Sequence, residues 1–96
     1  MNRELEKLRD KIDEIDLQLL ELLGKRAQHA AKTRLYKQKS KLITDGVDDP
    51  AREQRVIMHL LKANQSLLPD SAITHIFQTI IDECRALQKQ EDLKSS

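Results

Sequence analysis

The sequence predicts an all-α protein with three helices per chain, one of them very long. Two observations support this fold class. Only two glycines and two prolines interrupt 96 residues, among which helix-favouring Leu, Ala, Lys, Glu and Gln are abundant. Apolar residues also recur at steps of three and four positions, as on one face of a helix. A chain of this length is expected to form a single domain over residues 1–96.

The first helix is expected over residues 4–39, because no proline precedes Pro50 and one apolar stripe runs through the first part of the chain. Gly24 lowers the stability of a helix by about 1 kcal/mol relative to alanine but does not end it. The residues of the stripe are Leu5, Leu8, Ile12, Ile15, Leu19, Leu22 and Leu23.

The second helix is expected over residues 50–63. Asp49 followed by Pro50 is typical of an N-cap and a first helical position. Asp45 and Gly46 indicate a turn in the loop that precedes them. The apolar residues of this helix are Val56, Ile57, Leu60 and Leu61.

The third helix is expected over residues 71–90, after a short connection that ends at a candidate cap, Asp70. A polar tail over residues 91–96 is expected to follow it. The apolar stripe of this helix consists of Ile73, Ile76, Phe77, Ile80, Ile81, Cys84 and Leu87.

The length of the first helix predicts an intertwined homodimer. At 1.5 Å per residue, about 35 residues span roughly 50 Å. A compact chain of this size has a radius of gyration of only roughly 12–13 Å. The helix would therefore project beyond a compact three-helix monomer, and its apolar stripe needs a second chain to cover it.

Composition argues against several classes of function. The formal net charge is only +1, and one Tyr, one Phe and no Trp offer few surfaces for base stacking, so we expect no nucleic-acid partner. No apolar run approaches the roughly 18 residues of a membrane span, and the charged N-terminus is unlike a signal peptide. The single cysteine, Cys84, cannot form an internal disulfide. We therefore expect a cytoplasmic protein without a membrane partner.

Polar residues interrupt the apolar faces of all three helices. At about 100° per residue, several cations of the first helix fall within roughly 60° of the centre of its apolar stripe. Unpaired buried charges are costly, so these groups need partners. The inward-facing polar residues are Arg9, Arg26, Arg34, Lys37, Glu53 and Gln88.

Two interpretations of these inward charges remain open. Polar groups that converge within an apolar bundle are typical of a small-ligand site, and an excess of Arg and Lys indicates an anionic ligand. Alternatively, the charges form a satisfied structural network in which Asp16 and Glu53 neutralise the cations.

No group of residues indicates metal or covalent catalysis. His29, His59 and His75 lie far apart in the sequence without the spacing of metal ligands. Cys84 continues an apolar stripe, as a small core residue does. We expect no metal and no cofactor. Such a site suits a reaction that needs mainly positioning and electrostatics.

Three stretches match, in order, the pattern of one known family. "LRDKIDEIDLQLLELLGKR" (residues 8–26) has an Arg, two Ile-Asp steps, a Leu-rich run and a second Arg. "DPARE" (49–53) and "IFQTIIDECRALQ" (76–88) match the second and third helices of the same pattern. Together the stretches resemble the all-helical (AroQ-type) chorismate mutases, including the mutase domain of bifunctional chorismate mutase/prephenate dehydratase proteins.

This resemblance implies an interlocked dimer that rearranges chorismate to prephenate. Arg26 and the partner's Arg9 would hold the two carboxylates of chorismate. Lys37 and Gln88 would contact the ether oxygen of the breaking C–O bond. Glu53 would accept a hydrogen bond from the ring hydroxyl.

The resemblance also implies supporting roles. The backbone near Asp49 would assist at the ring hydroxyl, and Arg52 would support that end of the site. Cys84 stands where the family has a Ser that can contact a carboxylate. Three alternatives remain: an isochorismate pyruvate-lyase, an aminodeoxychorismate mutase of the same fold, or a non-catalytic helical dimer with a regulatory or interaction role.

Overall fold

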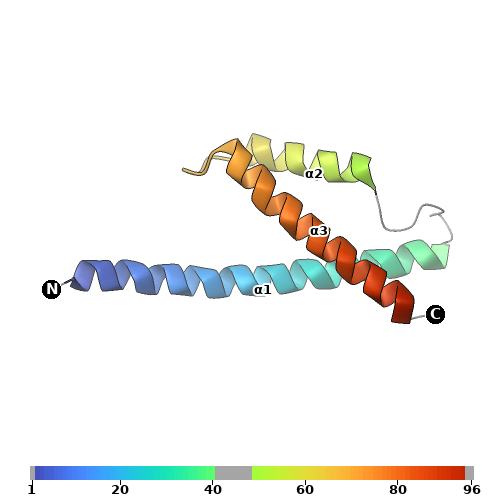
Figure 1. Cartoon of the computed structure of the whole chain (residues 1–96), viewed down its shortest axis with the longest axis horizontal. Coiled ribbons are helices and arrows are strands. Elements are labelled where there is room, and N and C mark those ends of the chain that lie inside the picture. Colours follow the sequence, from blue (N-terminus) through green and yellow to red (C-terminus); the bar gives the residue numbers. More distant parts are fainter. Residues whose placement is uncertain (1, 41–48, 95–96) are drawn as a thin grey trace.

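The computed structural model contains three helices and, in the part of the chain that it describes, no strand. It describes the backbone of residues 2–40 and 49–94 and the side chains of residues 2–33, 35 and 49–90. The helices are α1 (Arg3–Ser40), α2 (Pro50–Ala63) and α3 (Asp70–Lys94) (Figure 1). The predicted all-α class with one very long helix is confirmed.

The bounds of α1 and α2 agree with the predicted ones to within one residue, and the larger difference is at the end of α3. Asp70 is the first residue of α3 rather than the residue before it, and the helix continues to Lys94 through most of the predicted polar tail. The sequence Gln-Glu-Asp-Leu-Lys contains neither glycine nor proline, so nothing in it ends the helix at residue 90. The turn predicted at Asp45 and Gly46 lies outside the described residues.

The start of α2 has the predicted cap. The side chain of Asp49 accepts a hydrogen bond from the backbone nitrogen of Arg52 at 3.1 Å, and Pro50 occupies the first turn. This cap determines where α2 begins, and therefore which turn of α2 faces the other helices.

The connection between α2 and α3 is organised around one asparagine. The amide nitrogen of Asn64 donates to the carbonyl of Leu68 and to the carboxylate of Asp70, each at 3.0 Å. Its amide oxygen accepts from the backbone nitrogen of Ser66 at 3.0 Å. These bonds tie the end of α2 to the beginning of α3 and help to set the angle between the two helices.

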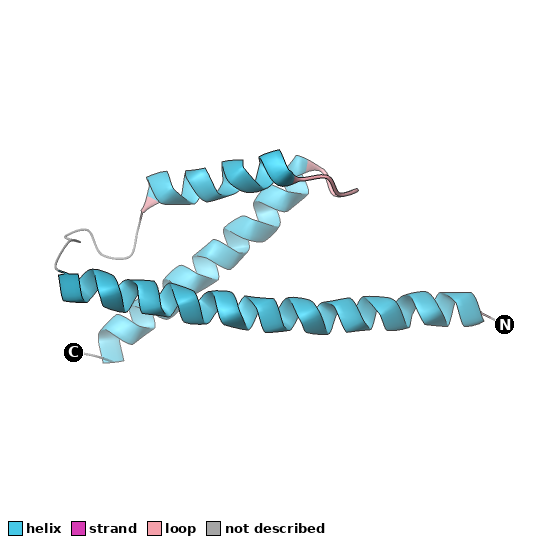
Figure 2. Ribbon diagram, turned by 180° about the vertical axis from the view of Figure 1, so that it is seen from behind, coloured by secondary structure: helices cyan, strands magenta, loops and turns pink. Residues whose placement is uncertain are grey.

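α3 lies between the other two helices. It packs against both α1 and α2, whereas α1 and α2 do not contact each other within the described residues (Figure 1 and Figure 2). Ile81 of α3 is the one buried hydrophobic residue of the described part, with 8% of its surface exposed. The small core therefore lies along α3.

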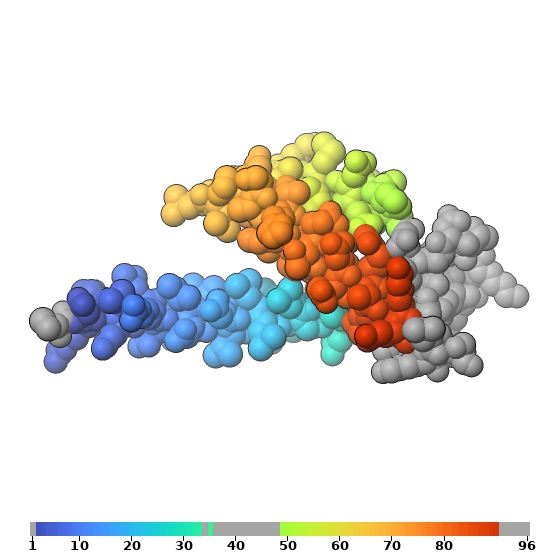
Figure 3. All heavy atoms as spheres, viewed as in Figure 1, coloured from blue at the N-terminus to red at the C-terminus, as the bar shows by residue number. Residues whose placement is uncertain are grey.

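The molecule is elongated, with principal extents of 61 × 29 × 15 Å and a radius of gyration of 17.2 Å. The N-terminal end of α1 extends past α2 and α3 (Figure 3). None of the described helices combines the length and apolar character that crossing a membrane requires. Within the single chain the whole predicted stripe of α1 is exposed: Leu5, Leu8, Ile12, Ile15, Leu19, Leu22 and Leu23.

Candidate functional site

A pocket of about 300 Å³ lies where α3 passes between α1 and the first turns of α2. α1, α3 and α2 together with its cap residue Asp49 each contribute four residues to the lining. In each case the four residues have the same relative positions, i, i+3, i+4 and i+7, which form one face of two helical turns. The pocket therefore joins three short helical faces that are far apart in the sequence.

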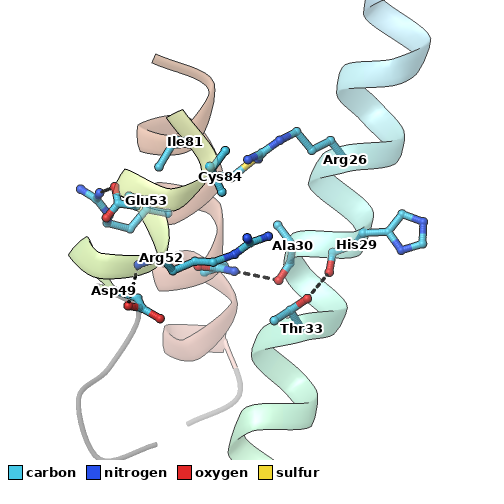
Figure 4. Close-up of a pocket in the computed structure, with 12 residues that line it drawn as sticks. Arg26, His29, Ala30, Thr33, Asp49, Arg52, Glu53, Ile81 and Cys84 are labelled. Atoms are coloured by element: carbon cyan, nitrogen blue, oxygen red, sulfur yellow. Dashed lines mark hydrogen bonds and ion pairs between the residues drawn. The ribbon is translucent and has the colours of Figure 1, made fainter. Parts of the chain in front are cut away.

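The face from α1 is joined to α3 by two hydrogen bonds. Nη1 of Arg26 donates to Sγ of Cys84 at 3.1 Å, and Nε2 of Gln88 donates to the carbonyl oxygen of Ala30 at 2.7 Å. Figure 4 shows Arg26 extending from α1 to Cys84, whereas His29 points away from the pocket residues. The two bonds hold a guanidinium and an amide at the α1–α3 crossing.

The face from α2 contains three charged side chains that differ in exposure, those of Asp49, Arg52 and Glu53. Arg52 is exposed and extends toward α1 (Figure 4). The Glu53 side chain is only 18% exposed. Asp49 lines the same end of the pocket, where its carboxylate also caps α2. The N-terminus of α2 thus positions the two carboxylates, those of Asp49 and Glu53, and also Arg52.

Glu53 forms an ion pair across the α2–α3 contact with Arg85. Nη2 of Arg85 contacts Oε1 of Glu53, and the Arg85 side chain is 28% exposed. Arg85 also lies 3.6 Å from a carboxylate oxygen of Asp82. A pair that is withdrawn this far from solvent is less screened than one on the surface.

The pocket has an excess of positive charge. Arg26, Arg52 and Arg85 face two carboxylates, those of Asp49 and Glu53. Guanidinium groups bind carboxylates through two parallel hydrogen bonds, so the arrangement suits a small anion. In the described part of the chain, no three His, Cys, Asp or Glu side chains gather where they could hold a metal ion.

Six of the eight residues predicted for the site line this pocket. They come from all three faces: Arg26, Asp49, Arg52, Glu53, Cys84 and Gln88. Arg9 does not, since it lies on the exposed N-terminal part of α1. Residue 37 belongs to α1, but the side chain of Lys37 lies outside the described residues, as does that of Arg34.

The predicted charge partners are only partly as expected. Glu53 pairs with Arg85 of α3, whereas the sequence suggested that it would neutralise the cations of α1. Asp16 lies on the exposed part of α1, outside the pocket. The physical reason is that Glu53 and Arg85 lie on directly packed helices, whereas α1 and α2 do not touch within the described residues.

Arg85 is an arginine of the pocket that the sequence-based prediction of the site did not include. A signal for it was present, because Arg85 follows Ile81 by four residues and precedes Gln88 by three, which places it on the same face of α3. At this end of α3 the predicted apolar stripe follows Ile81, Cys84 and Leu87 and does not include Arg85.

Comparisons with known proteins agree on one family. Residues 8–89 match the family model described as chorismate mutase type II. The bifunctional chorismate mutase/prephenate dehydratase of Aquifex aeolicus is 34% identical over 91 residues, which is 91% of this chain and 24% of that protein. The protein of the same name from Neisseria gonorrhoeae is 35% identical over 81 residues, with coverages of 84% and 21%. The chain thus spans less than a quarter of the length of these curated relatives.

Solved structures show the same fold. The chorismate mutase (form II) of Thermus thermophilus superposes with a TM-score of 0.83 at 23% identity, over 91% of this chain and 96% of that one. The chorismate mutase of Helicobacter pylori, solved in complex with prephenate, has a TM-score of 0.82 at 29% identity, over 93% of each chain.

Proposed function

The chain belongs to the chorismate mutase type II family, and from this premise we propose that it is an isomerase that rearranges chorismate to prephenate. The observation that supports this most directly is the meeting of Arg26, Arg52, Glu53 and Gln88 in one pocket of about 300 Å³. Cations, an acceptor and a neutral donor gathered there suit a small dicarboxylate that also has a hydroxyl and an ether oxygen.

The reaction is an intramolecular shift of a single substrate, so the first task of the site is orientation. The enolpyruvyl arm of chorismate must lie over the ring before the new C–C bond can form. Arg26 holds one carboxylate of the substrate, and the partner's Arg9 holds the other. Fixing both ends of the substrate removes rotational freedom before the barrier is crossed, which lowers the entropic part of the barrier.

The second task is to stabilise charge on the ether oxygen. When the C–O bond breaks ahead of C–C bond formation, this oxygen gains negative charge. Lys37 and Gln88 donate hydrogen bonds to it, and a donor of this kind is typically worth about 2.7–4 kcal/mol. An amide nitrogen has two N–H groups. One N–H of Gln88 donates to Ala30, which leaves the other for the substrate.

The remaining pocket residues bind the ring and support the cations. Glu53 accepts a hydrogen bond from the ring hydroxyl, and the backbone near Asp49 contacts the same group. Arg52 supports this end of the site. Cys84 accepts a hydrogen bond from Arg26 in the structure and so helps to direct that guanidinium.

We propose that the functional unit is a homodimer with shared sites. Arg26 lies seventeen positions after Arg9, or about 25 Å along the helix, so Arg9 does not reach the pocket of its own chain. The exposed apolar stripe of α1 is the surface that a second copy would cover. A dimer would therefore bury the stripe and deliver Arg9 at the same time.

We further propose that the protein is cytoplasmic, because a free cysteine such as Cys84 remains reduced in that compartment. The curated relatives are bifunctional, and the part of them that this chain spans is less than a quarter of their length, so the proposal concerns the mutase reaction alone.

A non-catalytic helical dimer is the second candidate. It is favoured by the internal pairing of the pocket residues, since Arg26 donates to Cys84, Gln88 to Ala30, and Arg85 pairs with Glu53. In this case the inward charges would form only a structural network.

The test is incubation of the purified chain with chorismate, with the product identified by NMR or chromatography. We expect prephenate well above the uncatalysed rate and its loss in Lys37→Ala. Lys32→Ala, which removes an exposed lysine of the same helix, is the matched control and should keep its activity. Absence of turnover would reject the mutase. Release of pyruvate from isochorismate would then indicate the lyase. Inactivity on both substrates would indicate the non-catalytic dimer.

A further inference from the structure

The Glu53 carboxylate is held by two side chains of α3. Arg85 forms an ion pair with its Oε1, and Nε2 of Gln78 donates to the same oxygen at 3.5 Å. The Glu53 and Arg85 side chains are 18% and 28% exposed. The pair thus lies at the wall of the pocket, where a charge without a partner would be unfavourable.

The two donors are connected to each other through Asp82. Its Oδ1 accepts from Nε2 of Gln78 at 3.1 Å and lies 3.6 Å from Nη2 of Arg85. The three residues occur at positions i, i+4 and i+7 of α3, on one face. Arg85 is therefore restrained by its own helix as well as by its contact with α2.

A glutamate side chain has several rotatable bonds and turns toward water unless something holds it. To accept a hydrogen bond from a substrate hydroxyl, the Glu53 carboxylate must face the pocket in one orientation. An ionised carboxylate has about four acceptor sites, so an arginine and a substrate hydroxyl can share it.

We propose that Arg85 is a positioning residue of this active site: its guanidinium anchors Oε1 of Glu53 and so presents the carboxylate to the hydroxyl of the substrate, a role that rests on the proposed function. Arg85 acts through Glu53 and does not itself need to contact the substrate.

This role differs in its consequences from direct binding of the substrate by Arg85. A residue that binds a substrate carboxylate directly contributes whether or not Glu53 is present. A positioning residue loses its effect once the group that it positions is removed. A double-mutant cycle separates these two cases, because it measures whether the two losses are independent.

The experiment measures kcat/KM for chorismate in the unmodified chain, in Arg85→Gln, in Glu53→Ala and in the double variant. We expect Arg85→Gln to lower kcat/KM by about 10- to 100-fold, as the misplacement of a catalytic group does. In the Glu53→Ala background, Arg85→Gln should lower kcat/KM by less than about 2-fold. Arg85→Lys should recover part of the loss, since it keeps the charge but not the planar fork.

Arg55→Gln, which removes an exposed arginine of α2 that lines neither pocket, is the matched control and should change little in either background. Thermal unfolding of every variant shows whether it is folded, and Arg85→Lys replaces Arg85→Gln in the cycle if the latter is unfolded. Losses that multiply in the double variant would overturn the positioning role while leaving the mutase proposal intact. An unmodified chain without turnover would overturn the mutase proposal, and this role with it.

Discussion

Gln88 links α3 to α1, and we propose that the same side chain also serves the chemistry. Its amide nitrogen donates to the Ala30 carbonyl at 2.7 Å, which fixes the direction of the amide at the α1–α3 crossing. The second N–H of the same nitrogen then points away from that carbonyl, as the planar geometry of the amide requires. A neutral donor held in this way needs no proton from solution, so the rate of the unmodified protein should be flat across neutral pH.

The first prediction concerns Gln88→Glu. A glutamate has an ordinary pKa of about 4.3, so above that pH it is mostly ionised and cannot donate a hydrogen bond. Removing such a donor typically lowers kcat by about 100-fold or more, and we expect this loss at pH 8. Activity should recover as the pH is lowered toward 5, which gives the variant an acid-shifted optimum in a pH–rate profile.

Gln65→Glu is the control for this profile, because Gln65 is exposed in the connection between α2 and α3. It should have the same flat profile as the unmodified chain. Equal activity of Gln88→Glu at about pH 5 and about pH 8 would refute the role of Gln88 as a donor to the ether oxygen.

At the scale of single elements, α1 is a 38-residue helix with a glycine in its interior. A Cβ at Gly24 would meet no heavy atom within 4 Å in the single chain. The glycine is therefore not required by a close approach of another segment of this chain. Gly24 lowers the stability of the helix locally, because glycine loses more backbone freedom on folding than other residues do.

The second prediction is that Gly24→Ala stabilises the protein by about 1 kcal/mol. For a domain of this size, such a gain raises Tm by about 4–8 °C. Thermal unfolding followed by circular dichroism measures the shift. Ala86→Gly, at an exposed interior position of α3, is the reciprocal change and should lower Tm by a similar amount. A lower Tm for Gly24→Ala would mean that a neighbouring chain approaches the backbone at this position.

At the scale of the whole molecule, the single chain is more extended than a compact domain of its length. Its radius of gyration is 17.2 Å, against roughly 13 Å expected for about 100 residues. The N-terminal end of α1 projects beyond the other helices. The apolar stripe of α1 is exposed, and Arg9 lies on this helix outside the pocket. The proposed dimer, with two sites shared between the chains, would explain both features.

The third prediction tests this sharing directly. Arg9→Ala and Arg26→Ala should each be nearly inactive, because each removes one carboxylate-binding group from both sites of a dimer. In a mixed dimer, one site keeps both arginines and the other has neither. After the two variants are unfolded and refolded together in equal amounts, random pairing should restore about one quarter of the unmodified activity.

Each variant refolded alone is the control and should stay inactive. A mixture no more active than its components would reject the shared-site assignment. Size-exclusion chromatography with light scattering gives the mass in parallel, which we expect to be twice the chain mass of 11.1 kDa.

Features that depend only on neighbouring residues could be predicted from the sequence. The three- and four-residue spacing of Leu and Ile predicted every helix, and Asp49 with Pro50 predicted the start of α2, because helix periodicity and capping act within a few residues. The end of α3 was placed too early, since a polar composition at residues 91–94 does not by itself end a helix.

Which of the inward-facing polar groups meet could not be predicted, because it depends on how the helices pack. Glu53 pairs with Arg85, Arg26 with Cys84, and Gln88 with Ala30, between positions 32 or 58 residues apart. Periodicity gives the face on which a side chain lies, but the partner on that face depends on where two helices cross. That crossing is set by the packing of α3 around Ile81 and by the Asn64 connection, and so the pocket exists only once all three helices are in place.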